Sequence, residues 1–147
     1  TTYLQVFLLL CGSILLSNCN EEARGFALPE GDIERGKAAF TNLSCNECHS
    51  ISGIEWKGGP DNLNIPLGGE LPSKKIYGEL VTSVIHPSHK IAQPYTQNNT
   101  TVKTKAGSSK MKNYNYVMTV QELIDLVAFL QSEYKIKIPN RYSYPYY

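Results

Sequence analysis

The sequence is poor in several features that mark common classes of protein. Its formal net charge is only +1 at pH 7, which argues against the strongly basic surface that bulk nucleic-acid binding needs. Only four cysteines occur, and two of them lie in an apolar stretch near the N-terminus, so no disulfide framework is left over. A pattern of alternating strands and helices is also missing, which argues against a thioredoxin-like dithiol. The 147 residues therefore indicate one small domain with a tail.

What the chain does contain is one short motif, Cys45-Asn46-Glu47-Cys48-His49, with the pattern C-x-x-C-H. This is the pattern for covalent attachment of a c-type haem. Each thiol can form a thioether with a haem vinyl group, and the histidine that follows at once can bind the iron. A C-x-x-C pair also occurs in zinc sites, and a Cys2His2 set is available here as Cys45, Cys48, His86 and His89. A structural zinc module is therefore the alternative to haem.

The first 30 residues are predicted to be a targeting segment followed by a linker. Residues 3–16 are almost continuously apolar, which suits a signal-peptide core and falls short of the about 20 residues of a membrane span. The segment Leu16-Ser17-Asn18-Cys19 resembles a bacterial lipobox, although Asn18 departs from the usual small residue. Ordinary cleavage nearby and an uncleaved anchor are the alternatives. We expect a signal peptide or lipoprotein leader over residues 1–19 and a tether over 20–30.

These features together predict where the protein works. A lipobox, ordinary cleavage and an uncleaved anchor all imply export, and c-type haem is normally attached on the outer side of the bacterial inner membrane. We therefore expect the periplasmic side of a bacterial membrane, with anchoring through lipidation of Cys19 or through the apolar N-terminal segment.

Three stretches of the chain have helical patterns. Apolar residues recur at helical spacing over 33–43, and Gly36 in the middle of that stretch indicates the close approach of another helix. Residues 74–86 form a second candidate helix, which Pro87 ends. Thr119 and Glu122 form a capping box for a third helix that runs to about residue 134 and is apolar on more than one face. Residues 135–147 form a tail rich in tyrosine and proline.

The two methionines of the chain are candidate ligands of a haem iron. A thioether is a soft ligand that suits iron opposite a histidine and raises its reduction potential. Met111 lies in a polar loop, where packing into the core does not explain it, whereas Met118 stands just before the third helix and suits core packing. Met111 is therefore the predicted ligand.

Charge is unevenly distributed along the chain. Residues 80–121 contain no acidic residue and five lysines, which are Lys90, Lys103, Lys105, Lys110 and Lys112. Such a stretch is a candidate basic face for an acidic partner, and a solvated loop is the alternative.

The motifs over residues 31–134 resemble class I cytochrome c, the small single-haem kind. The segment E-R-G-K-A-A-F, with Gly36 and Phe40, matches the N-terminal helix of that family, and D-L-V-A-F-L at residues 125–130 matches its C-terminal helix. Gly59-Pro60 with Leu63 matches the loop after the haem motif. Residues 77–95 and 111–130 also resemble the membrane-attached cytochromes of bacterial respiratory chains.

The resemblance implies an all-α fold in which the N- and C-terminal helices cross and long loops wrap one covalently attached haem c. It implies iron ligation by His49 and Met111, and a hydrogen bond from His49 to the carbonyl of Pro60. Where the family usually has Met-Pro, this chain has Met111-Lys112. The expected function is electron transfer between respiratory redox partners, such as a dehydrogenase and an oxidase, without enzyme activity. A haem sensor or peroxidase-like protein with an open sixth site is the alternative.

Overall fold

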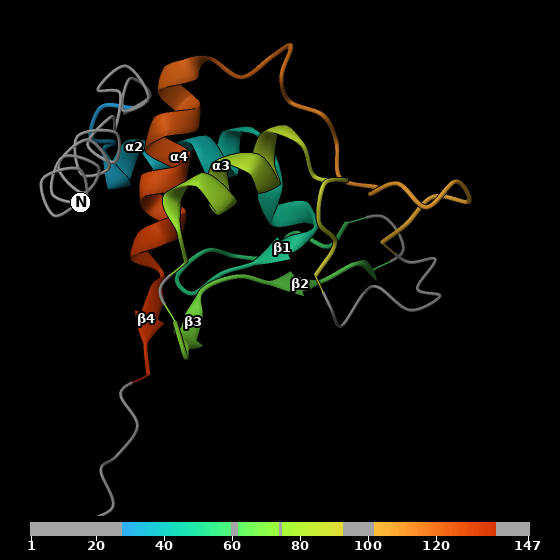
Figure 1. Cartoon of the computed structure of the whole chain (residues 1–147), viewed down its shortest axis with the longest axis horizontal. Helices are drawn as coiled ribbons and strands as arrows, with labels where there is room; N and C mark the ends of the chain where they lie inside the picture. Colours follow the sequence, from blue (N-terminus) through green and yellow to red (C-terminus); the bar gives the residue numbers. More distant parts are fainter. Residues whose placement is uncertain (1–27, 60–61, 74, 93–101, 138–147) are drawn as a thin grey trace, which may run out of the picture.

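The structure is a computed structural model that describes residues 28–59, 62–73, 75–92 and 102–137 (Figure 1). The described part of the chain has three α-helices, which are α2 (Ile33–Asn42), α3 (Tyr77–Ile85) and α4 (Val120–Ser132). These match the three predicted helical stretches. A short 3-10 helix, η2 (Cys45–Glu47), follows α2. The predicted leader 1–19, residues 20–27 of the predicted tether and residues 138–147 of the predicted tail lie outside the described residues.

Two small parallel strand pairs accompany the helices, and the all-α expectation did not include them. Strand β1 (His49–Ser50) pairs with β2 (Ile65–Pro66), and β3 (Gly69–Leu71) pairs with β4 (Tyr134–Ile136). Figure 1 shows β4 continuing from the end of α4 to lie beside β3. The first residues of the predicted tail therefore belong to the folded domain.

Helix α2 begins at a good N-cap and buries one face. The side chain of Asp32 accepts a hydrogen bond from the backbone N–H of Arg35 at 2.8 Å, which satisfies one of the free donors of the first turn. The buried residues Gly36, Ala39 and Phe40 follow at spacings of three and four, so they share one face. That face packs against α4.

The contact between α2 and α4 depends on Gly36. A Cβ atom at this position would overlap the backbone carbonyl of Asp125 and would lie 2.7 Å from Cβ of Phe129. One turn further along α2, the rings of Phe40 and Phe129 meet edge to face, with centroids 5.8 Å apart. The close helix approach predicted from Gly36 is confirmed.

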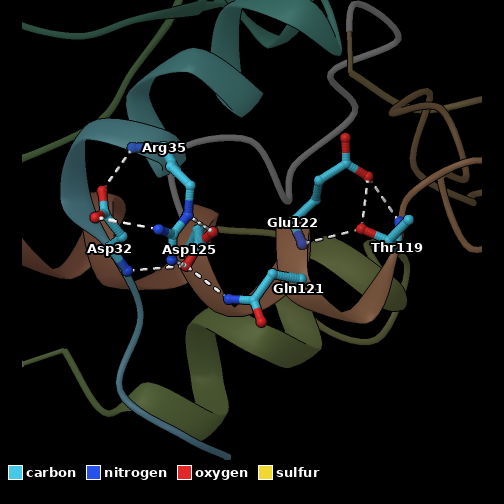
Figure 2. Close-up of polar contacts among 6 residues, drawn as sticks. All are labelled: Asp32, Arg35, Thr119, Gln121, Glu122 and Asp125. Carbon is cyan, nitrogen blue, oxygen red and sulfur yellow. Dashed lines mark hydrogen bonds and ion pairs between the residues drawn. The ribbon is translucent and has the colours of Figure 1, made fainter.

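Helix α4 is the most buried element of the described domain. Its predicted capping box is present: the N–H of Glu122 donates to Oγ1 of Thr119 at 3.1 Å, and the N–H of Thr119 donates to Oε2 of Glu122 at 2.8 Å (Figure 2). Leu80 and Val84 of α3 join its side chains in one apolar cluster. No helix within the described ranges is long and apolar enough to span a membrane.

A polar cluster also joins α2 to α4. The carboxylate of Asp125, whose residue is only 2% exposed, accepts four hydrogen bonds from three residues (Figure 2). The donors are Nε and Nη2 of Arg35 at 2.8 and 3.3 Å, the N–H of Asp32 at 2.8 Å, and Nε2 of Gln121 at 3.0 Å. The hydrogen bond from Arg35, followed by that from Asp32, lowers the pKa of Asp125 from 3.8 to about 2.

This lowered pKa predicts a pH dependence of folding. Because the carboxylate of Asp125 is favoured in the folded state, its stabilising contribution is present above pH about 4 and is lost as the pH falls towards about 2. We expect Asp125→Asn to lower the urea midpoint at pH 6. The difference in urea midpoint between this variant and the unmodified protein should become smaller between pH 4 and pH 2. Glu34→Gln, at an exposed position of α2, is the control for loss of one charge. A difference in urea midpoint that stays constant from pH 4 to pH 2 would contradict the lowered pKa of Asp125.

Candidate functional site

A cavity of about 530 Å³ lies between the C-x-x-C-H motif, the ends of α2 and α3, the loop before α4, and α4 itself. This volume is typical of sites that hold small molecules and cofactors. Four of the five predicted site residues line it: Cys45, Cys48, His49 and Met111. Much of the remaining wall is apolar, including Phe40, Leu63, Leu80, Val84, Leu126 and Leu130.

The turn that carries the two cysteines is fixed by its neighbours. The backbone reverses at Ser44, which has a φ of 57°, and then forms the single turn η2. Asn46, between the cysteines, is buried and donates from Nδ2 to the carbonyl of Glu55 at 3.0 Å. The indole N–H of Trp56 donates to the carbonyl of Glu47 at 3.1 Å. These bonds hold both cysteines on one rigid turn beside the cavity.

The side chains of both cysteines line the cavity. Cys45 and Cys48 are half-buried, and they form no disulfide. Burial raises the pKa of the Cys45 thiol to about 11. Burial also raises the pKa of Cys48, and the neighbouring carboxylate of Glu47 adds to that shift. Both groups are therefore protonated thiols at neutral pH, on the same wall of the cavity as His49.

His49 is held in the tautomer that a metal ligand requires. Its Nδ1 lies 3.3 Å from the carbonyl oxygen of Ile65. A carbonyl can only accept, so Nδ1 carries the hydrogen and Nε2 keeps its lone pair. Burial lowers the pKa of His49, and the hydrogen bond to Ile65 opposes that shift only in part. The ring is therefore neutral and can donate a lone pair from Nε2.

The acceptor for His49 comes from the β1–β2 pair. His49 stands opposite Ile65 in the parallel register, and the N–H of Ile65 donates to the carbonyl of Cys48 at 2.8 Å. Pro60, the predicted acceptor, lies outside the described residues. Its neighbour Gly59 passes so close to the cysteine turn that a Cβ there would overlap the carbonyl of Glu47. Ile65 was not predicted, because a two-residue strand leaves no periodic signal in the sequence.

The loop before α4 closes the other side of the cavity. Met111 is half-buried on this loop, and its N–H donates to Oγ of Ser109 at 3.1 Å. Met118 also lines the cavity, and it packs against the apolar cluster formed with α4. The structure thus brings Met111 to the same cavity as His49, while the packing role expected for Met118 agrees with its contacts.

The four residues of the zinc alternative do not come together. His86 and His89 are both exposed, with their rings 5.8 Å apart, and neither lines the cavity. Among the described residues, no group of three or more His, Cys, Asp or Glu side chains could hold a metal ion. The described residues therefore do not support the structural zinc module, the alternative to haem. Both histidines lie beyond the end of α3, on a turn that directs them to solvent.

A largely apolar cavity lined by two cysteines, a neutral imidazole and a thioether has the kinds of side chain that suit a haem. The family model described as cytochrome c matches residues 33–133, well over half of the chain. The chain therefore belongs to the cytochrome c family, whose members bind covalently attached haem c and are generally electron carriers. No solved structure matches the protein significantly.

Proposed function

We propose that this protein is a class I cytochrome c that carries single electrons between redox proteins. Its haem is attached through Cys45 and Cys48 and ligated by His49 and Met111. The observation that carries this proposal is the shared cavity: residues far apart in the sequence place an imidazole, two thiols and a thioether around one space of suitable size. A bound haem c supplies an iron that cycles between the ferrous and ferric states.

The side chains of the cavity then have distinct tasks. The Ile65 carbonyl orients His49 and increases the electron donation of its Nε2. The thioether of Met111 favours the ferrous state and so raises the reduction potential. The apolar wall keeps water away from the iron. This also raises the reduction potential, because the ferric state carries the greater charge and is destabilised more by the loss of water. Ligation by two side chains leaves no coordination position for a substrate, as a carrier requires.

Export remains part of the proposal. The support for it is the apolar segment 3–16 and the lipobox-like Leu16-Ser17-Asn18-Cys19, together with a haem type that is attached outside the inner membrane in bacteria. We propose that the protein works on the periplasmic side, anchored through Cys19 or through the apolar segment. Expression of the chain with Cys19→Ala, followed by membrane fractionation and mass spectrometry, separates the two kinds of anchor.

Lysines outnumber acidic residues in the lining of the cavity, where Glu47 is the one acidic residue among those described. Lys75, Lys90, Lys110 and Lys112 all line it, and three of these come from the acid-free stretch of the sequence. Two of these lysines form long ion pairs: Lys90 to Glu79 and Lys112 to Glu47 both measure 3.9 Å, and both lysine side chains are largely exposed. Such pairs are weak, so the positive field of Lys90 and Lys112 extends into solvent. We infer that the physiological partner, a dehydrogenase or an oxidase, presents an acidic docking face.

Electron transfer to small charged oxidants tests this function. The ferrous protein should reduce ferricyanide, an anion, with transfer of one electron per chain. We expect Lys110→Glu or Lys112→Glu to slow this reaction about threefold at low ionic strength, and to speed the reaction with the cation tris(phenanthroline)cobalt(III). Both effects should fade at about 0.5 M salt, where charges are screened.

Lys37→Glu is the matched control for charge reversal. Lys37 is an exposed residue of α2 that does not line the cavity, so its reversal should leave both rates nearly unchanged. Equal effects of the Lys37 and Lys112 reversals would remove the argument for a basic docking face. A chain that exchanges no electron with either oxidant would overturn the proposal of an electron carrier.

A further inference from the structure

The hydroxyl of Tyr114 joins the loop that carries Met111 to the segment that carries the cysteines. The phenol of Tyr114 donates to the carbonyl of Leu43 at 2.9 Å. Leu43 is the C-cap of α2 and stands two residues before Cys45. Its carbonyl is one of those that a helix end leaves without an intrahelical partner. Tyr114 and Leu43 also line the cavity, so this bond closes the wall between its two sides.

The backbone of Tyr114 is fixed as well as its side chain. Its carbonyl accepts from the N–H of Val117 at 3.0 Å and from the N–H of Met118 at 2.9 Å, just before α4 begins. The tyrosine therefore stands on a hydrogen-bonded turn attached to the most buried helix. From that fixed position its ring reaches across to the end of α2. Met111 lies three residues earlier on the same loop.

Two other contacts between this loop and neighbouring elements are more open to water. Lys112 reaches Glu47 at 3.9 Å with 71% of its side chain exposed, and such a pair contributes little to holding the loop in place. Asn115 donates from Nδ2 to the carbonyl of Ile85 at 3.0 Å, but Asn115 is exposed, so water competes for this bond. Tyr114 is half-buried, and burial raises the pKa of its phenol to about 12, so it stays a neutral donor at ordinary pH.

We propose that Tyr114 is a positioning residue that holds the Met111 loop closed over the cavity and thereby sets how often the sixth iron position opens. This inference rests on the proposed function, because it takes Met111 as the sixth ligand. The hydroxyl acts only in the closed state, where Leu43 is within reach. Its removal therefore favours the open loop, in which Met111 has left the iron.

An external ligand reports this opening directly. Imidazole binds the ferric iron only after Met111 has left, so its apparent affinity is proportional to the population of the open state. Tyr114→Phe removes the hydroxyl and keeps the ring. We expect this variant to bind imidazole about fivefold more tightly, from the loss of one partly buried hydrogen bond. Titration of the purified ferric holoprotein, followed by its visible spectrum, measures the change.

Tyr116→Phe is the matched control, because it makes the same chemical change two residues away on a side chain that is 93% exposed. Imidazole affinity should be unchanged in that variant. If Tyr114→Phe lowers the urea midpoint but leaves imidazole affinity at the native value, the hydroxyl is merely structural and the proposal is overturned. A native ferric protein without spectroscopic signs of methionine ligation would instead show that the proposed ligand set has failed, and this inference would fail with it.

Discussion

Met111→Leu should abolish the weak far-red charge-transfer band of the ferric protein, which is the signature of a methionine sulfur on haem iron. Leucine keeps the size and apolar character of the side chain and removes the sulfur. We also expect the reduction potential to fall by more than about 0.1 V, because the thioether favours the ferrous state. The ferrous variant should bind carbon monoxide rapidly, since its sixth position is then open.

Met118→Leu is the matched control for this experiment. Met118 lines the same cavity but packs against the apolar cluster around α4, so it is expected to fill space. The variant should keep the far-red band and stay slow towards carbon monoxide. The reverse outcome, with the band lost only in Met118→Leu, would show that Met118 is the sulfur ligand and that the assignment to Met111 is wrong. A native protein that binds carbon monoxide at once would favour the sensor or peroxidase-like alternative.

Gly36→Ala should destabilise the protein by about 3 kcal/mol, at the upper end of the usual cost of overpacking. The added methyl group would overlap the carbonyl of Asp125 and press on Phe129, and a backbone carbonyl cannot turn aside as a flexible side chain can. Helices α2 and α4 would have to separate, which would also disturb the edge-to-face contact of Phe40 with Phe129. Urea unfolding of the holoprotein, followed by circular dichroism, measures the loss.

Gly78→Ala provides the matched control, since Gly78 also lies in a helix but has open space where a Cβ would be placed. This variant should be as stable as the native protein, or more stable by up to about 1 kcal/mol, because alanine is the better helix former. Equal losses in the two variants would show that the close approach of α2 and α4 is not what requires glycine at position 36.

The sequence predicted those parts of the fold that have local causes. The capping box of Thr119 and Glu122 sets the start of α4, and the spacing of apolar residues around Gly36 marks the buried face of α2. Strands β3 and β4 were missed, because three residues are too few to show an alternating pattern.

The site was predictable to a similar extent. Cys45, Cys48 and His49 belong to one contiguous motif, which requires no knowledge of the fold. The contacts that orient the site come from elsewhere: Ile65 is 16 residues from His49, and Tyr114 is 71 residues from Leu43. No pattern in the neighbouring sequence indicates either contact. The described residues do not support the zinc hypothesis for the same reason, because residue types that could form a metal site do not show on which side of the chain His86 and His89 will lie.

The most direct test of the whole account is the fate of the haem when the purified chain is denatured. We expect the haem to stay with the polypeptide on a denaturing gel and in acidified acetone, and the mass of the chain to increase by that of one haem. The variant in which Cys45 and Cys48 are both replaced by alanine should lose this haem. A native chain that releases its haem into the solvent, or that has the mass of the bare polypeptide, would contradict covalent attachment and the function proposed from it.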